Sequence, residues 1–145
     1  MTTSSLATAT STSRLSNEPG RALVTIRGQH FVTDSPPGLG GPNEAPNPVE
    51  LLLSALAACA TFVCERVARE QSIPLQGVVV AVAGDFDPRG VCGEAVDPRF
   101  QALRVRLSLE GPDAAQSSLL VQAFKTRCPI YTTLSRSAPI EVTVA

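Results

Sequence analysis

Residues 47–64 read NPVELLLSALAACATFVC, which combines the start signals of a helix with a long apolar run. Asn47 is a favoured helix N-cap, Pro48 fits the first helical position, and Glu50 stands three residues after the cap, as in a capping box. The residues that follow, 51–64, carry no charge. A helix that is apolar nearly all round is buried, so the sequence predicts a central helix covered on most sides.

The composition indicates one globular domain over residues 1–145, with residues 1–20 as a Thr/Ser-rich strand or a frayed segment. The net charge of −1 comes without a basic stripe, which argues against nucleic acid as a partner. The uncharged run of about fourteen residues is shorter than the roughly twenty that a membrane span needs, so no membrane partner is expected. No secretory signal is readable, and we therefore expect a cytoplasmic, reducing location in which the four cysteines are thiols or catalytic groups.

The order of the expected elements is strands, helix, strands, helix, strand, which indicates the α+β class. The clearest strand is residues 100–110, where apolar and polar residues alternate. The expected strands are residues 6–16, 21–34 with a turn at Gly28-Gln29, 75–87, 100–110 and 139–144. The expected helices are residues 47–71, 111–127 and 129–134, and residues 35–46 form a long loop.

Two cysteines stand in settings that suit thiol chemistry. Cys128 directly precedes Pro129 at the expected start of a short helix, where backbone N–H groups and the helix dipole favour the thiolate. Arg127 and Lys125 are cations close to it in the sequence. Cys59 lies within the long helix, where burial raises a thiol pKa. If the fold brings the two together, the chain is a two-cysteine redox enzyme, and otherwise they are core residues.

Other chemistries are poorly supported. The chain has no Cys-x-x-Cys motif and a single histidine, His30, so no metal site is expected. Cys64 lies about 140° round the helix from Cys59, which makes these two unsuited to pair with each other. Cys92 falls in the loop between two strands and is interpreted as incidental.

Three segments together resemble the OsmC/Ohr family, that is, osmotically inducible protein C and the organic hydroperoxide resistance proteins. They are NPVELLLSALAAC at 47–59, CPIYTTL at 128–134 and DSPPGLGG at 34–41, and the similarity covers residues 21–144. The resemblance implies an intertwined homodimer in which two long central helices pack with antiparallel sheets. The active sites would lie at the subunit interface.

The resemblance also implies thiol-dependent reduction of organic hydroperoxides in oxidative-stress defence, with no metal or flavin. Cys59 matches the peroxidatic cysteine, which attacks the O–O bond and becomes a sulfenic acid. Cys128 matches the resolving cysteine, which condenses with it to a disulfide. A dithiol, in some members a lipoylated protein, then reduces that disulfide.

The chain departs from the active pattern at one position. In active members a Glu follows the Asn-Pro pair at once and pairs with an Arg that activates the thiolate, whereas Val49 stands here. Glu50 comes one residue later, about 100° round the helix. The candidates for activating Cys59 are therefore Arg27, Arg21 and Glu50, with a helix cap as the other reading of Glu50. The alternative function is a dimer of the same fold that binds an apolar or thiol-bearing small molecule at the subunit interface without peroxidase turnover.

Overall fold

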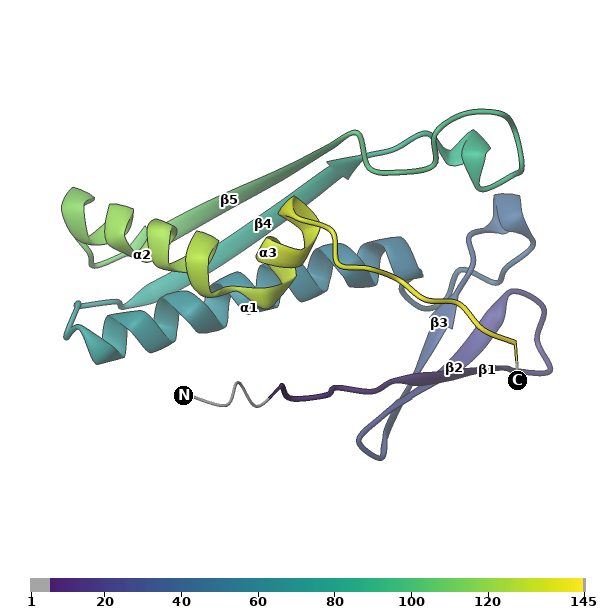
Figure 1. The fold of residues 1–145 in the computed structure, drawn as a ribbon, viewed down its shortest axis with the longest axis horizontal. Coiled ribbons are helices and arrows are strands. Elements are labelled where there is room, and N and C mark those ends of the chain that lie inside the picture. The colour runs from purple at the N-terminus through teal and green to yellow at the C-terminus, as the bar shows by residue number, and fades with distance from the viewer. Residues whose placement is uncertain (1–5, 145) are drawn as a thin grey trace. The chain divides into compact units, whose positions relative to one another are not determined.

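A computed structural model describes residues 6–144 (Figure 1). The chain forms two compact units, and the division falls between Leu51 and Leu52, within the longest helix. We describe each unit by itself. The prediction of a single domain stays a prediction.

The first unit holds a three-stranded antiparallel sheet. Its strands are β1 (Thr12–Leu15), β2 (Arg21–Ile26) and β3 (Gln29–Asp34), in the order β1-β2-β3. The two-residue turn between β2 and β3 is Arg27-Gly28, with φ of 50° and 76°. Positive φ at both positions is the geometry of a type I′ hairpin turn, whose twist matches that of the strands. The predicted turn at Gly28-Gln29 was therefore wrong by one residue, because Gln29 already pairs with Ile26.

Helix α1 (Pro48–Glu70) begins with the capping box that the sequence predicted. The Asn47 side chain accepts from the Glu50 N–H at 2.9 Å, and the Glu50 carboxylate accepts from the Asn47 N–H at 2.9 Å. Two backbone donors that the helix itself leaves unpaired are satisfied in this way. The loop that leads to the helix contains a short 3-10 turn, η1 (Pro37–Leu39).

The second unit combines the rest of α1 with a two-stranded antiparallel sheet and two further helices. β4 (Gly77–Asp85) pairs along its whole length with β5 (Ala102–Glu110), and the loop between them contains η2 (Pro88–Gly90). Helices α2 (Ala114–Arg127) and α3 (Pro129–Ser135) follow, and α1 and α2 lie alongside the strand pair (Figure 1). The predicted alternation in β5 is confirmed, with Leu103, Val105, Leu107 and Leu109 half-buried and the residues between them exposed.

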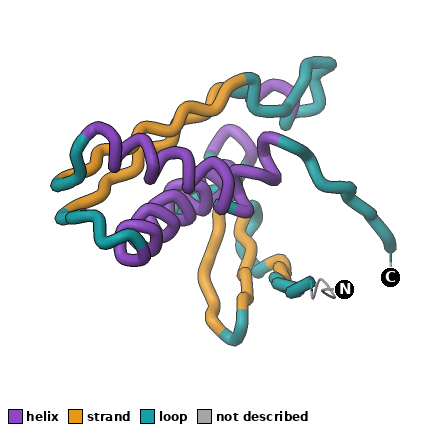
Figure 2. Tube along the Cα trace, turned by 60° about the vertical axis from the view of Figure 1, so that its left-hand side comes forward, coloured by secondary structure: helices purple, strands orange, loops and turns teal. Residues whose placement is uncertain are grey.

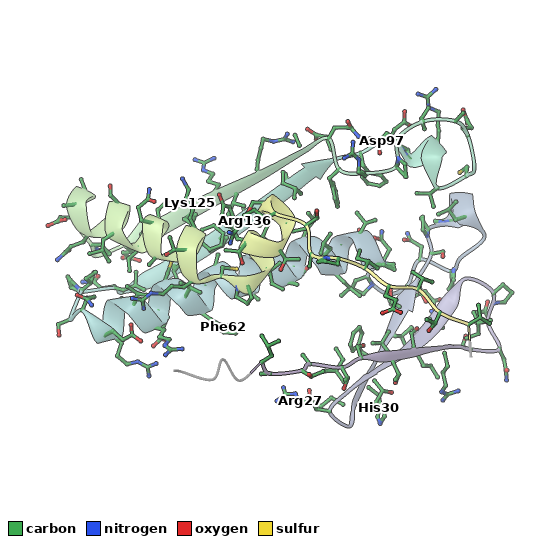
Figure 3. All side chains as sticks on the ribbon, viewed as in Figure 1. Arg27, His30, Phe62, Asp97, Lys125 and Arg136 are labelled. Atoms are coloured by element: carbon green, nitrogen blue, oxygen red, sulfur yellow. The ribbon has the colours of Figure 1, made fainter. Side chains whose placement is uncertain are left out.

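One stripe of α1 makes the core of this unit. Leu56, Ala60, Cys64 and Val67 recur at helical spacing and are at most 2% exposed. They form one cluster with Leu120, Ala123 and Phe124 of α2, and the inward residues of β4 and β5 pack against that cluster. Within one protomer the helix is thus covered on one side, and the predicted burial on most sides stays a prediction. Phe62, on another face, is 70% exposed (Figure 3).

By length and composition, α1 could cross a membrane. It has 23 residues and a mean hydropathy of 1.7 over its most apolar window, of which 28% is buried. A core helix of a soluble protein passes the same test, so this property alone does not distinguish the two.

The predicted closing strand, residues 139–144, is not a strand in the structure. Residues 136–144, which follow α3, are drawn as loop (Figure 2) and are exposed. Ile140, Val142 and Val144 are 86–99% exposed and alternate with polar residues. The sequence pattern of a half-buried strand is present, but within the described part of one protomer no strand is assigned to it.

We expect Leu120→Ala to destabilise the second unit, because it opens a cavity where α2 meets α1. Leu120 is fully buried, and large-to-small changes at such positions cost about 2–5 kcal/mol of the free energy of unfolding. Leu119→Ala is the matched control, since Leu119 is 44% exposed on the same helix. Urea unfolding followed by circular dichroism measures both, and equal losses would contradict this description of the core.

Candidate functional site: a pair of adjacent thiols

The second unit brings Cys59 and Cys128 together. Their Sγ atoms lie 2.7 Å apart although the residues are 69 positions apart in the sequence. Both cysteines are free thiols. The S–S bond of a disulfide is about 2.05 Å long, so the two sulfurs are already close to bonding distance. The expectation that these two sulfurs lie within a few ångströms of the disulfide distance is confirmed.

Cys128 occupies the corner between α2 and α3. Its backbone is extended, with φ −79° and ψ 114°, because the proline that follows disfavours the helical region at this position. Its N–H donates to the Phe124 carbonyl and ends α2, and its Sγ accepts from the Tyr131 N–H at 3.3 Å and caps α3. The predicted helix start with Cys128 as its cap is confirmed. The sulfur is thereby fixed in direction as well as position.

Cys59 is held on α1 beside the start of α3. Burial is the main cause that raises the pKa of its thiol to about 11, and the contact with Cys128 raises it further. The backbone N–H of Ile130 acts the other way and lowers the Cys59 pKa. At neutral pH, Cys59 in this environment is therefore protonated. Burial likewise raises the pKa of Cys64, whose Sγ lies 4.0 Å from the Leu120 carbonyl oxygen in the core.

Neither cation that adjoins Cys128 in the sequence has a recorded contact with its sulfur among the described residues. Arg127 forms an ion pair with Glu70 at 2.7 Å, and Glu70 also accepts from Arg66. Lys125 is exposed on α2 (Figure 3). Proximity along the chain does not bring these side chains to the sulfur, because an α-helix turns each successive side chain by about 100°.

In the first unit, Arg21 is engaged by carboxylates. Its Nε and Nη2 donate to the two oxygens of Asp34, each at 2.8 Å, and Nη2 also donates to Glu44 at 2.8 Å. Asp34 is fully buried and accepts from the N–H groups of Glu44 and Ala45 as well. The guanidinium is the main cause that lowers the Asp34 pKa to about 2. This cluster ties the loop before α1 to the sheet.

The other residues singled out from the sequence lie in a turn, a strand, a helix cap and a loop. Arg27 lies in the β2–β3 turn, and His30 contacts Thr25 on the exposed surface of the hairpin (Figure 3). Glu50 closes the capping box described above, in line with its reading as a helix cap. Cys92 is exposed in the loop between β4 and β5. A role of Arg21, Arg27 or Glu50 in activating Cys59 stays a prediction.

An apolar pocket lies in the second unit, and the sequence reasoning did not anticipate it. It has a volume of about 190 Å³. Its walls come from α1, β5 and α3, and its lining residues are Leu56, Leu103, Val105, Tyr131, Leu134 and Ser135. The alternation in β5 identified Leu103 and Val105 as inward residues, but it cannot distinguish a packed position from a pocket wall. Among residues 6–144, no three His, Cys, Asp or Glu side chains gather closely enough to hold a metal ion.

The chain matches a known protein family. The sequence model of the family described as OsmC-like protein matches residues 41–143, most of the chain. The chain belongs to the OsmC family. Among curated proteins, none matches this chain.

Solved structures of OsmC proteins share the fold. An OsmC-like protein from Mycoplasma pneumoniae superimposes with a TM-score of 0.75 at 19% identity, over 90% of this chain and 89% of that one. An organic hydroperoxide resistance protein OsmC from Legionella pneumophila, also described as a predicted redox protein, gives 0.67 at 23% identity, over 92% of each chain. An organic hydroperoxide resistance protein from Elizabethkingia anophelis gives 0.68 at 20% identity, over 93% and 92%. The α+β class with antiparallel sheets is thus confirmed.

The Arg21–Asp34 pair predicts a specific acid sensitivity. The Asp34 pKa falls from 3.8 to about 2 on folding, so its contribution to stability is complete above pH 3.8 and is lost as the pH falls through about 2. We expect Asp34→Asn to lower the urea midpoint at neutral pH. The difference in urea midpoint between the variant and wild type should become smaller as the pH falls from 3.8 to about 2.

Asp85→Asn is the control for this experiment. Asp85 pairs with Arg104, but its side chain is 60% exposed, so solvent screens the interaction and the gap should be smaller. A gap between Asp34→Asn and wild type that does not change with pH would contradict the assignment.

Proposed function

We propose that this protein is a thiol-dependent peroxidase that reduces organic hydroperoxides through Cys59 and Cys128 in oxidative-stress defence. The observation that carries the proposal is the 2.7 Å separation of the two sulfurs, both reduced, in one compact unit. Two structural relatives are named organic hydroperoxide resistance proteins, which supports the choice of substrate class. No metal or flavin takes part, and the proposed location is the cytoplasm.

The exposures of the two thiols support different roles for them. Cys59 is partly exposed and Cys128 is fully buried, so a hydroperoxide reaches Cys59 first. The Cys59 thiolate attacks the terminal oxygen of the hydroperoxide, the one that carries the hydrogen. The O–O bond breaks, and the leaving alkoxide takes a proton to become an alcohol. The product on Cys59 is a sulfenic acid. Cys128 attacks that sulfur as its own proton leaves, which forms the disulfide and releases water. A dithiol, such as a lipoylated protein, returns both cysteines to thiols by exchange.

Formation of the Cys59 thiolate is the demanding step. A pKa of about 11 leaves only a small fraction ionised at neutral pH. A cation near the sulfur would favour the charged form, and Arg21 and Arg27 are the proposed sources, with Glu50 as the candidate for orienting one of them. Arg21 has two carboxylate partners, so in this role it would have to exchange or share them.

A homodimer is part of the proposal. Ala55, Ala58 and Phe62 are exposed on one face of α1, at helical spacing and without a charge among them. Exposed apolar surface of this kind is typical of an interaction site, and the small alanines let a second helix approach closely. A second copy of α1 packed on this face would give the pair of long central helices that the family resemblance implies.

The alternative proposal is a dimer of this fold that binds an apolar or thiol-bearing small molecule without peroxidase turnover. The raised pKa of Cys59 favours it, and so does Val49 at the position where active members carry Glu. The two proposals differ in whether hydroperoxide is consumed in the presence of a dithiol.

Cys59→Ser should reduce dithiol-dependent consumption of cumene hydroperoxide to the uncatalysed background, because the attacking sulfur is lost. Without added dithiol, Cys128→Ser should consume about one equivalent of hydroperoxide per protomer and accumulate the sulfenic acid, since the resolving thiol is absent. Mass spectrometry of the intact protein follows the oxidation states. Cys64→Ser and Cys92→Ser are the controls and should turn over like wild type. Full activity of Cys59→Ser would refute the peroxidase, and an inactive wild type would favour the alternative.

Phe62→Asp should weaken the proposed dimer, because it places a charge in the apolar face of α1. Losses at the centre of an interface reach about 2 kcal/mol or more, roughly thirtyfold in the dissociation constant. Light scattering coupled to size exclusion over a dilution series measures the change. Gln122→Asp, on the exposed side of α2, is the control. A wild type that is monomeric at all concentrations would contradict the dimer.

A further inference from the structure

The free thiols of Cys59 and Cys128 form a preorganised pair of sulfur donors. Their Sγ atoms lie 2.7 Å apart, and the Cys128 sulfur is also held by the Tyr131 N–H at 3.3 Å. Folding has already closed the long loop between two residues that are 69 positions apart. A ligand that bonds to one sulfur therefore meets the second at a high effective concentration.

The surroundings of the pair do not suit an ordinary metal ion. Structural zinc sites have four ligands, and among residues 6–144 no three His, Cys, Asp or Glu side chains gather closely enough to hold a metal ion. Metal ions also bind the thiolate rather than the thiol. Burial raises the pKa of Cys59 to about 11, so this sulfur carries its proton at neutral pH. The pair therefore suits a ligand that needs two sulfurs and reacts with protonated thiols.

We propose that the reduced pair binds trivalent arsenicals that carry one organic group. In water such a compound has the form R–As(OH)₂. Its two arsenic–oxygen bonds break, arsenic–sulfur bonds form to Cys59 and Cys128, and two water molecules leave with the two thiol protons. Arsenic stays trivalent throughout, so the step needs no oxidant and no reductant. This binding goes beyond the proposed peroxidase function and does not depend on it.

The geometry of the pair fits a single bridging atom. An atom bonded to both sulfurs at about 2.3 Å, the length of a zinc–sulfur bond, holds them roughly 3.5 Å apart. The present separation of 2.7 Å must then widen by about 1 Å. Cys59 is the thiol with room to move, because it is partly exposed whereas Cys128 is fully buried and caps α3. The organic group of the arsenical then lies on the Cys59 side, which is the side open to solvent.

The number of sulfurs sets the selectivity of the site. Inorganic arsenite has three arsenic–oxygen bonds to exchange and is held best by three thiols. Cys64 is the other cysteine on α1, but it lies about 140° round the helix from Cys59. Its sulfur is fully buried and lies 4.0 Å from the Leu120 carbonyl oxygen. The pair therefore favours an arsenical whose third bond already goes to carbon.

Titration of the whole reduced chain with phenylarsine oxide tests the site. Calorimetry should give one equivalent per chain, and the intact mass should rise by that of the reagent less one water. Cys59→Ser and Cys128→Ser should each bind at least about a hundredfold more weakly, because a single sulfur cannot chelate. Cys92→Ser and Cys64→Ala remove thiols outside the pair and should bind as wild type does. Equal binding by wild type and Cys128→Ser would overturn the proposal.

A second measurement separates a folded site from the ordinary reactivity of thiols. A ligand that binds the folded chain more tightly than the unfolded chain raises the urea midpoint. Phenylarsine oxide should raise the midpoint of wild type and of Cys92→Ser, and it should leave that of Cys59→Ser unchanged. Arsenite should bind wild type more weakly than phenylarsine oxide does. An unchanged midpoint for wild type, or tighter binding of arsenite, would overturn the proposal.

The proton balance tests whether protonated thiols react. Because both thiol protons leave in water, calorimetry at pH 7 in buffers of different ionisation enthalpy should show no net proton exchange. Metal binding to cysteines, in contrast, releases protons. Uptake of protons on addition of phenylarsine oxide would show that thiolates react, and it would overturn the proposed condensation.

The outcomes also distinguish this site from the peroxidase. If the wild type binds one equivalent of phenylarsine oxide but consumes no hydroperoxide, the peroxidase fails and the arsenical site stands. If it consumes hydroperoxide through Cys59 but phenylarsine oxide neither binds nor inhibits, the peroxidase stands and the arsenical site fails. If both proposals hold, one equivalent of phenylarsine oxide should stop turnover, and an excess of a small dithiol should restore it.

Discussion

The contact of one stripe of α1 with α2 fixes the geometry on which the site depends. Ala60 and Cys64 are fully buried small residues, and they let α2 approach until the Leu120 carbonyl oxygen lies 4.0 Å from the Cys64 sulfur. α2 then ends at Cys128, which is fully buried and lies directly beside Cys59. Interiors pack without spare volume, so a larger side chain at either position would displace the end of α2 and separate the two sulfurs.

The same burial that positions Cys59 opposes the ionisation of its thiol. Cys59 lies next to Cys128 in apolar surroundings, and burial there raises the pKa of its thiol to about 11. Among the described residues of one protomer, the backbone N–H of Ile130 is the one group that lowers the Cys59 pKa. The short distance between the two sulfurs thus does not by itself lower the pKa of Cys59. A reactive thiolate at this position also requires a nearby group that stabilises its negative charge.

Patterns that depend on local chemistry could be predicted from the sequence. The capping box at Asn47 and Glu50, the alternation in β5 and the helix start after Cys128 follow from rules that act within a few residues. The pairing of Cys59 with Cys128 could be predicted only from the family resemblance, because no rule of local structure relates residues so far apart in the sequence. The sequence missed the Arg27-Gly28 turn by one residue, since a positive φ at a non-glycine residue is uncommon. It also missed the pocket, because the side chains that wall a pocket have the same pattern as those that fill a core.

Cys128 caps α3 with the same sulfur that faces Cys59. The Tyr131 N–H holds this sulfur at the first turn of α3, and α3 also carries a wall of the apolar pocket. One sulfur atom therefore determines both where a helix begins and how near the second thiol lies.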